Sequence, residues 1–371
     1  MPTEQTDEGA GMDENGRSRR ATVLDVAKAA GVSSATVSRV LNANYPVADA
    51  TRARVHKAID ELGYVVNAHA RALAGATGRT VGIIVNDVTD PFYAYISRGV
   101  ERQASRSGRL CLVCSTQGEP AKELAFVDML HERRADAVIL VGGSHDDKGY
   151  AAELAARARS MAHDDGPTLV LCGRPSLGPD VPTAVVEYDN EGGGFALTDH
   201  LLSQEHRRIL FLGGPPGLST TRDRLAGHHR ALRLRGIEPD PALQQTGAFN
   251  RRFGHERTRE LLRAGRPAFT AVFGANDHVA AGAVQAIEEA GLRIPEDLSV
   301  AGYDNVPLAR DLRPQLTTVH VPLEEMGAEA VRRVLSDPDE DSNSPAPGRT
   351  VRLGTHVVVR DSVAPPPPSR R

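Results

Sequence analysis

Residues 22–42 hold the pattern that restricts this fold most: two short helices joined by a turn that contains glycine. Thr22, followed three positions later by Asp25, is close to a capping box and predicts a helix start. Gly31 ends that helix, and Ser33 can cap a second one. Two short helices joined in this way indicate a helix-turn-helix, whose second helix enters the major groove of DNA. We therefore expect this stretch to bind DNA.

The second predicted helix carries side chains that suit a groove. Arg39 can pair with guanine through two hydrogen bonds, and Ala35 offers a methyl contact. The small hydroxyl side chains beside them can donate to phosphate or cap the helix. The alternative for Arg39 is a surface salt bridge. The expected DNA contacts in this region are Thr22, Ser33, Ser34, Ala35, Thr36, Ser38, Arg39 and Asn42.

The chain resembles the lactose-repressor (LacI/GalR) family over about residues 21–361, and the resemblance is most specific over 21–75. Val47-Ala-Asp-Ala-Thr51-Arg52 opens a third helix, and Gly63-Tyr64 begins a stretch similar to the family's hinge segment. By this resemblance Ser34, Ala35 and Arg39 are the base-reading residues. It also implies an all-α helix-turn-helix domain with a hinge helix, followed by an α/β sensor of two sub-domains, similar to periplasmic sugar-binding proteins.

The hinge segment 67–75 carries its own hypothesis. Asn67 can cap a helix, but eight or so residues are too few for a helix that is stable alone. We expect it to fold against a partner copy on DNA. The resemblance assigns Leu73 to a wedge between base steps in the minor groove, a known use of apolar side chains. The alternative for Leu73 is packing on the next domain. The expected hinge contacts are Asn67, Ala70 and Leu73; Val66 stands where the family commonly has proline.

From Arg79 onward apolar strands alternate with helical stretches, which indicates parallel sheets covered by helices. The first set begins with Val81–Val85 and the second with Arg208–Leu212, so we expect two similar sub-domains with a cleft between them. Ligands in such folds lie at the carboxyl ends of the strands. By the resemblance, Leu323–Leu335 returns to the first sub-domain and Val351–Val359 to the second.

Polar and aromatic residues follow several of these strands. Carboxylates, amides and guanidinium groups ringed by aromatic faces suit a polyol, although each residue alone is more often a cap or an ion pair. Gly173 and Val321 stand where sugar binders of the family often have aspartate and glutamine, so a modified sugar, a glycoside or a nucleoside stays open. The expected effector contacts, by resemblance, are Asp90, Phe92, Tyr93, Arg174, Arg222, Phe249, Asn276 and Asp304.

The distribution of charge agrees with a DNA-binding N-terminal domain. The formal net charge of the chain is −4, yet residues 21–79 hold seven Lys/Arg against four acids. This local excess is what neutralises phosphates, and it is modest, so we expect two copies to bind together. No apolar heptad helix that would join dimers ends the chain. We therefore expect a homodimer.

The length and segment pattern predict the following parts. We expect a disordered tail (1–20), the helix-turn-helix domain (21–66), the hinge helix and linker (67–79), an effector and dimerisation domain (80–361) and a second disordered tail (362–371). Within the effector domain, sub-domain one takes about 80–189 and 322–337, and sub-domain two takes about 190–321 and 338–361.

Other functional classes are set aside. Three cysteines are too few for a disulfide scaffold, and Cys111 and Cys114 lack the further ligands of a zinc site. There is no phosphate loop or nucleophile elbow, so we expect no catalysis, no metal and no cofactor. No apolar run reaches the ~20 residues of a membrane span, which favours a cytoplasmic protein without membrane contact. We predict a repressor of transcription that a small polar ligand controls. The alternative is a regulator that senses a nucleoside or another non-sugar effector, or that acts as an activator.

Overall fold

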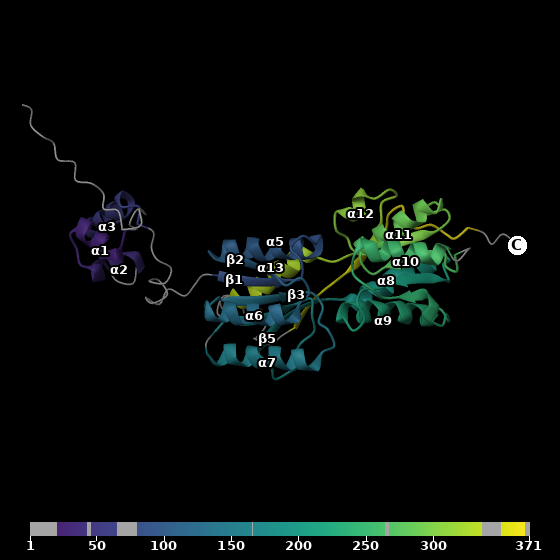
Figure 1. The fold of residues 1–371 in the computed structure, drawn as a ribbon, viewed down its shortest axis with the longest axis horizontal. Coiled ribbons are helices and arrows are strands. Elements are labelled where there is room, and N and C mark those ends of the chain that lie inside the picture. The colour runs from purple at the N-terminus through teal and green to yellow at the C-terminus, as the bar shows by residue number, and fades with distance from the viewer. Residues whose placement is uncertain are drawn as a thin grey trace, which may run out of the picture. The chain divides into compact units, whose positions relative to one another are not determined.

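The structure is a computed structural model, which describes residues 21–42, 46–64, 80–164, 166–263, 267–335 and 350–367. The chain divides into two compact units, Met1–Gly78 and Arg79–Arg371 (Figure 1). The first unit is helical and the second contains two α/β sub-domains. The predicted fold class is therefore confirmed.

The first unit contains the helices α1 (Val23–Ala30), α2 (Ser34–Asn42) and α3 (Asp49–Glu61). The capping box forms as predicted: the Asp25 amide donates to the Thr22 hydroxyl at 3.3 Å, and the Thr22 amide donates to the Asp25 carboxylate at 2.8 Å. Gly31 takes φ 63°, a left-handed conformation that glycine adopts without steric cost. The buried core of this unit consists of Val26, Ala27, Ala30, Val37, Val40, Val55, Ala58 and Tyr64.

Sub-domain one of the second unit is a six-stranded parallel sheet with the order β11-β5-β4-β3-β1-β2. Neighbouring residues of a strand face opposite sides: Ile83 enters the core beneath α5 and α13, whereas Ile84 enters the core beneath α6 and α7. Its elements are β1 (Thr80–Val85), α5 (Pro91–Arg106), β2 (Leu110–Ser115), α6 (Pro120–Glu132), β3 (Ala137–Val141), α7 (Lys148–His163), β4 (Thr168–Cys172), β5 (Thr183–Tyr188), α13 (Leu323–Leu335) and β11 (Thr350–Leu353).

Sub-domain two repeats this design with the sheet order β12-β10-β9-β8-β6-β7, in which only β12 runs antiparallel to its neighbour. Helices α8 and α9 pack together, as do α10 and α11. Its elements are α8 (Asn190–Ser203), β6 (Ile209–Leu212), α9 (Ser219–Leu234), β7 (Gln244–Gln245), α10 (Arg251–Arg263), β8 (Ala271–Gly274), α11 (Asp277–Glu289), β9 (Ser299–Asp304), α12 (Leu308–Asp311), β10 (Thr317–His320) and β12 (His356–Val358).

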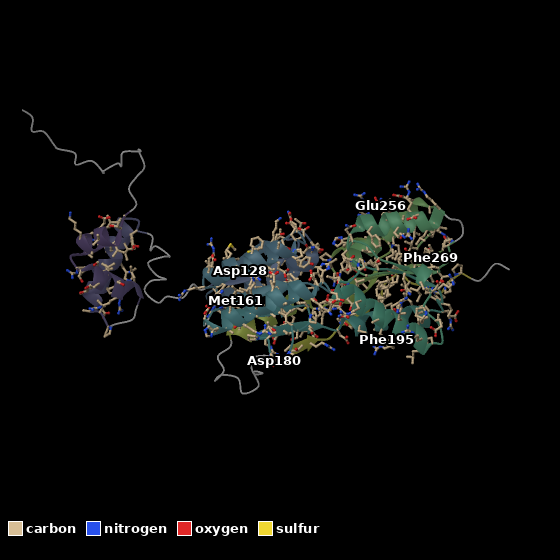
Figure 2. The ribbon with its side chains drawn as sticks, turned by 60° about the horizontal axis from the view of Figure 1, so that its bottom comes forward. Asp128, Met161, Asp180, Phe195, Glu256 and Phe269 are labelled. Carbon is tan, nitrogen blue, oxygen red and sulfur yellow. The ribbon has the colours of Figure 1, made fainter. Side chains whose placement is uncertain are left out.

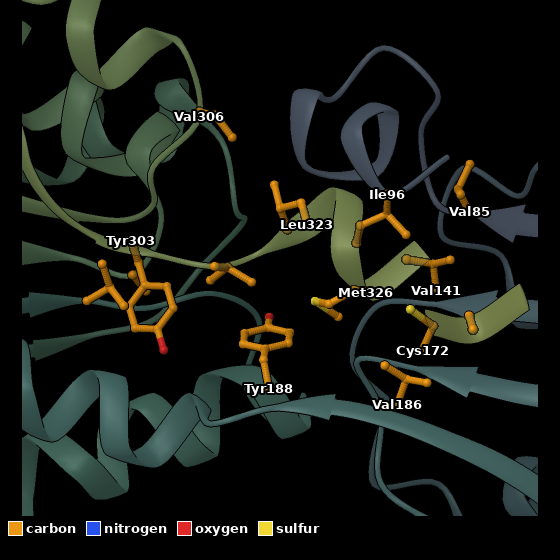
Figure 3. Close-up of a cluster of buried hydrophobic side chains, with 14 of the residues drawn as sticks. Val85, Ile96, Val141, Cys172, Val186, Tyr188, Tyr303, Val306, Leu323 and Met326 are labelled. Carbon is orange, nitrogen blue, oxygen red and sulfur yellow. The ribbon is translucent and has the colours of Figure 1, made fainter. Parts of the chain in front are cut away.

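Three chain segments cross between the sub-domains: β5 to α8, β10 to α13, and β11 to β12. One cluster of buried side chains contains residues of both sub-domains, among them Tyr188 and Met326 from sub-domain one and Tyr303 and Val306 from sub-domain two (Figure 3). The crossings and this shared core place the carboxyl ends of both sheets against each other.

The assignment of Val351–Val359 as a whole to sub-domain two is wrong. The structure divides the segment: β11 pairs with β5 in sub-domain one, and β12 pairs with β10 in sub-domain two. Both halves are short and only partly buried. Their apolar pattern alone therefore does not distinguish the two sheet edges.

Side chains of both sub-domains divide into a buried core and an exposed surface; Figure 2 labels examples. Met161 and Phe269 are buried, whereas Asp180 and Glu256 are exposed. Among the described residues, no helix combines the length and apolar character that a membrane crossing needs.

Candidate DNA-reading helix and effector cleft

The predicted DNA-reading helix, α2, divides its residues between core and solvent as a groove reader requires. Val37 and Val40 are buried against the other two helices. On the other side, Ser34, Ala35, Ser38 and Arg39 are exposed. This face combines hydroxyl, methyl and guanidinium groups, which are able to contact phosphate and base edges.

The remaining predicted DNA contacts have local structural roles or lie elsewhere. Ser33 caps α2, because its hydroxyl accepts the Thr36 amide at 3.2 Å and pairs with the Thr36 hydroxyl at 2.9 Å. Thr22 caps α1. Asn42 is the last residue of α2. The predicted hinge contacts Asn67, Ala70 and Leu73 lie outside the described residues.

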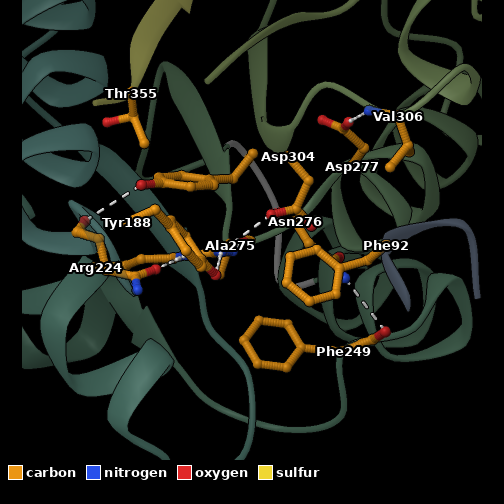
Figure 4. Close-up of polar contacts among 12 residues, drawn as sticks. Phe92, Tyr188, Arg224, Phe249, Ala275, Asn276, Asp277, Asp304, Val306 and Thr355 are labelled. Atoms are coloured by element: carbon orange, nitrogen blue, oxygen red, sulfur yellow. Dashed lines mark hydrogen bonds and ion pairs between the residues drawn. The ribbon is translucent and has the colours of Figure 1, made fainter. Parts of the chain in front are cut away.

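Arg224 is the centre of the polar cluster between the two sub-domains. Its side chain, on α9, is only 2% exposed. It donates to the Tyr188 hydroxyl, to the Asp304 carboxylate and to the Asn190 amide oxygen, each at 3.0 Å, and also to the Ala275 carbonyl (Figure 4). The guanidinium also lies 3.7 Å from the ring centroid of Tyr303, a cation–π contact. The guanidinium therefore fixes the orientation of the Tyr188 hydroxyl, the Asp304 carboxylate and the Asn190 amide.

Asp304 ends β9 and faces this cluster at an unusual backbone angle. Its φ is 99°, a positive backbone angle that residues other than glycine rarely adopt. Burial and, less strongly, the charge of Asp90 raise the pKa of Asp304 to about 7, against the lowering effect of Arg224. Asp90 belongs to sub-domain one, so two carboxyl groups from opposite sub-domains act on each other here.

Asn276 and Asp277 hold the loop after β8. Asn276 caps α11 through the Val279 amide at 2.8 Å, and its side-chain amide donates to the Phe249 carbonyl at 3.4 Å. Asp277 is buried and accepts the Thr318 hydroxyl at 2.6 Å and the Val306 amide at 2.8 Å. Burial raises the pKa of Asp277 well above its ordinary value.

Sub-domain one contributes the start of α5. Asp90 caps this helix through the Phe92 amide at 2.9 Å, and burial raises the pKa of its carboxyl group. The rings of Phe92 and Tyr93 meet edge to face at 5.2 Å, and Phe92 also contacts Tyr188 at 6.4 Å. Phe249 of sub-domain two packs against the same core. Aromatic faces therefore flank the polar cluster from both sub-domains.

Two predicted arginines do not point at this cluster. Arg222 is 62% exposed and pairs with Asp223, because a side chain two residues from Arg224 points to nearly the opposite face of a helix. Arg174 is buried, and its guanidinium binds Glu123 at 2.8 Å within sub-domain one. The sequence left an ion pair open for each of these residues alone, but it did not identify the partner.

The residues that sequence reasoning missed are Arg224, Tyr188, Asn190 and Asp277. A signal for Arg224 exists: Thr221, Arg224, His228 and Ala231 recur at helical spacing and are all buried. An arginine on an apolar helical face needs a buried anionic partner. No comparable local signal identifies Tyr188 or Asn190.

A cavity of about 450 Å³ adjoins the cluster. Both sub-domains line it, with Arg174 and Tyr188 on one side and Ser219 and Asp223 on the other. Its size is within the range of small-molecule sites. Several charged groups around it form ion pairs within the chain, such as Glu187 with Arg352 at 3.0 Å and Glu191 with Arg230 at 3.4 Å. The carboxylate of Asp189, which also lines the cavity, accepts the Gly192 amide at 2.8 Å.

Comparisons with known proteins identify the families that the two parts of the chain resemble. Residues 22–67 match bacterial regulatory proteins of the lacI family, and residues 198–363 match a periplasmic binding protein-like domain. The transcriptional repressor PurR of Photobacterium profundum is 34% identical over 92% of this chain and 98% of its own length.

Solved structures show the same likeness. A complex of the transcriptional regulator CelR with cellobiose is 33% identical, with a TM-score of 0.66, and covers 92% of this chain and all of that one. The lac repressor dimer bound to operator and the anti-inducer ONPF is 27% identical, with a TM-score of 0.79, and covers 93% of this chain and all of that one.

Proposed function

Because this chain belongs to the LacI family of bacterial regulatory proteins, which are DNA-binding transcriptional regulators with ligand-binding domains, we propose that it is a homodimeric repressor controlled by a neutral, hydroxyl-rich ligand. The most suitable ligand is a sugar or a sugar derivative, and the protein acts in the cytoplasm. Ligand binding between the sub-domains shifts their separation and thereby the population that binds the operator.

The Arg224 cluster carries this proposal. A polyol needs paired donors and acceptors for its hydroxyls and a flat apolar surface for its CH face. Arg224, Asp304 and Asn276 supply hydrogen-bond donors and acceptors. The rings of Phe92 and Phe249 flank them and supply the flat surface. Two pairs of opposite charge that line the adjoining cavity, Glu187 with Arg352 and Glu191 with Arg230, compensate each other, which favours a ligand without a large net charge.

A nucleoside or nucleobase is the second candidate. Flat aromatic faces from both sub-domains also suit a planar base, and the PurR relatives keep a ligand other than a sugar open. An activator would use the same ligand-dependent change in DNA binding and would differ only in its effect on transcription.

Dimerisation rests on the free edge of sub-domain one. β2 is the last strand of its sheet, and it exposes Leu110, Leu112 and Val113, with Leu110 72% exposed. An apolar edge strand of this kind is a template for pairing with another chain. The lac repressor structure is that of a dimer, and a second copy of this chain is the occupant that we propose.

The test starts from thermal unfolding. The melting temperature of the purified protein is measured against sugars, glycosides, nucleosides and nucleobases; a ligand at 100 times its Kd stabilises by ~2.7 kcal/mol. DNA that the protein selects from a random duplex pool is then titrated with and without the ligand that stabilises it. We expect a neutral sugar derivative that changes DNA affinity. Stabilisation by nucleosides alone would replace the sugar proposal, and a ligand without effect on DNA binding would contradict effector control.

A further inference from the structure

A loop of sub-domain one is hydrogen-bonded directly to the start of α9 in sub-domain two. The Ser219 amide donates to the Ser144 carbonyl at 2.9 Å, and the Asp146 amide donates to the Gly217 carbonyl at 3.0 Å. The Ser144 amide donates to the Ser219 hydroxyl at 3.1 Å, and His145 and Leu218 form an antiparallel bridge. We call residues 143–146 and 217–219 the strap.

The strap is a non-covalent connection between the sub-domains. It adds to the three places where the chain itself crosses from one to the other. It requires close approach: a Cβ atom on Gly143 would lie 2.6 Å from the Thr220 hydroxyl. Ser219 also lines the 450 Å³ cavity, and α9 carries Arg224. The strap therefore connects sub-domain one to the helix at the centre of the candidate effector site.

Arg174 is hydrogen-bonded to the end of β3, directly before the first residue of the strap. Its guanidinium donates to the Gly142 carbonyl at 3.1 Å and to the Val141 carbonyl at 3.4 Å, at the end of β3. The same group forms an ion pair through two hydrogen bonds with Glu123 of α6, at 2.8 and 3.2 Å, and lies 3.4 Å from the Tyr150 hydroxyl of α7. Arg174 thus links the end of β3 to two covering helices.

We propose that Arg174, together with Glu123, is a positioning residue that holds the strap and so sets the separation of the two sub-domains. Arg174 lines the cavity, and we assign its effect to the backbone of Val141 and Gly142 rather than to contact with the effector. The inference takes from the proposed function only that the effector binds between the sub-domains. Removing Arg174 takes its hydrogen bonds from two backbone carbonyls and from the partly buried Glu123 carboxylate, which keeps only its bond to the Tyr150 hydroxyl within the described part of the chain; this favours a rearranged loop.

Amide-resolved hydrogen exchange on the full-length protein, without added ligand, tests this proposal. The Ser144, Asp146 and Ser219 amides report on the strap directly. In Arg174→Ala we expect these three amides to exchange roughly tenfold faster or more, while amides of β8 keep their protection. The matched control is Arg157→Ala, which removes the ion pair of Arg157 with Asp128 between the same two helices and leaves the strap bonds in place.

A second variant opens the strap independently of the ion pair. Gly143→Val retains Arg174 but forces the two loops apart, so we expect the same three amides to lose protection. If Arg174→Ala does not fold, Arg174→Lys is measured instead, because it keeps one charge but cannot bind the carboxylate and both carbonyls together. Unchanged protection in the folded Arg174 variant overturns the proposal.

Effector affinity separates positioning from direct binding. Once the ligand panel identifies a stabilising compound, we expect its Kd to rise in both Arg174→Ala and Gly143→Val. A higher Kd in the Arg174 variant with normal exchange of the strap would mean that Arg174 binds the effector itself, and would overturn the positioning role. A failure of the sugar proposal leaves the exchange experiment unaffected.

Discussion

Two arginines of α9 show how much two positions along a helix change the role of a residue. Arg222 is exposed and pairs with its neighbour Asp223, whereas Arg224 is buried and joins Asp304 across 80 residues of sequence. The difference follows from the 3.6-residue period, which turns the two side chains to nearly opposite faces. A guanidinium that is buried and hydrogen-bonded through all three nitrogens can orient a ligand; an exposed one has no such constraint.

Arg224→Lys is expected to abolish the melting shift that the effector causes, because lysine keeps the charge but loses the planar fork that binds Tyr188, Asp304 and Asn190 together. The measurement is thermal unfolding with the compound identified in the ligand panel. Arg222→Ala is the matched control and should retain the shift. Loss of the shift in the control, with retention in Arg224→Lys, would contradict this assignment.

His228 predicts how stability depends on pH. It lies in the core of sub-domain two, 2.9 Å from the Thr198 hydroxyl and stacked on Phe211 at 5.5 Å. Burial lowers the pKa of His228 from 6.5 to about 3. Between these values the unfolded chain binds a proton that the folded chain does not, so the free energy of unfolding falls as pH falls through this window.

This contribution amounts to ~1.4 kcal/mol for each pH unit within the window. We expect His228→Phe to remove it, so that urea unfolding from pH 6.5 to pH 4 gives a flatter curve than the natural protein. His163, exposed on α7, provides the control variant His163→Phe. Parallel curves for the natural protein and His228→Phe would show that the histidine is not kept neutral by burial.

At the scale of an element, the position of α2 follows from which of its side chains are buried in the three-helix core. The core takes Val37 and Val40, and the face with Ala35 and Arg39 stays exposed. Periodicity and capping residues predict this division, because they are local properties of the helix. The side chains that we expect to read bases were therefore predicted without knowledge of any distant contact.

Arg39→Ala is expected to weaken binding to selected DNA by ~1–3 kcal/mol and to change binding to scrambled DNA much less, because a base contact carries sequence discrimination. Fluorescence anisotropy with both duplexes at fixed salt measures this difference. Arg54→Ala removes the same charge from α3 and should weaken both duplexes equally. Equal losses in Arg39→Ala would restrict Arg39 to a phosphate contact.

At the scale of the whole molecule, the free apolar edge of β2 argues for assembly. Leu110, Leu112 and Val113 lie on one strand whose outer backbone groups have no strand beside them in the described sheet. The net positive charge of the DNA-binding unit is small. A second copy would add phosphate contacts, and each added contact raises the affinity for DNA. Assembly and DNA affinity are therefore coupled.

Leu112→Lys is expected to convert the dimer to monomer, because a charge on the edge strand opposes apolar pairing. Light scattering coupled to size-exclusion chromatography gives the mass in solution. Leu234, at the end of α9, is 70% exposed and provides the control Leu234→Lys, which should remain dimeric. A dimeric Leu112→Lys would place the interface elsewhere.

The sequence by itself determined the elements and their class. Thr22, Asp25 and Gly31 mark a helix through bonds within a few residues, and the buried strands are continuous apolar runs such as Ala137–Val141. These signals are short-range, so a reading of the chain recovers the helix-turn-helix and two α/β sub-domains without tertiary information. Asp90, Phe92, Phe249, Asn276 and Asp304 were predicted as effector contacts because they lie at or after the carboxyl ends of expected strands and because the family resemblance assigns these positions to a sugar site.

Only the tertiary structure decided which side chains meet. The choice of Arg224 over Arg222, the pairing of Arg174 with Glu123, the division of 350–358 between two sheets and the strap all depend on contacts between distant segments. A local pattern places a residue on a face or at a strand end. Its partner is chosen by the packing of two sub-domains against each other, where burial forces each charge and each backbone amide to find a partner.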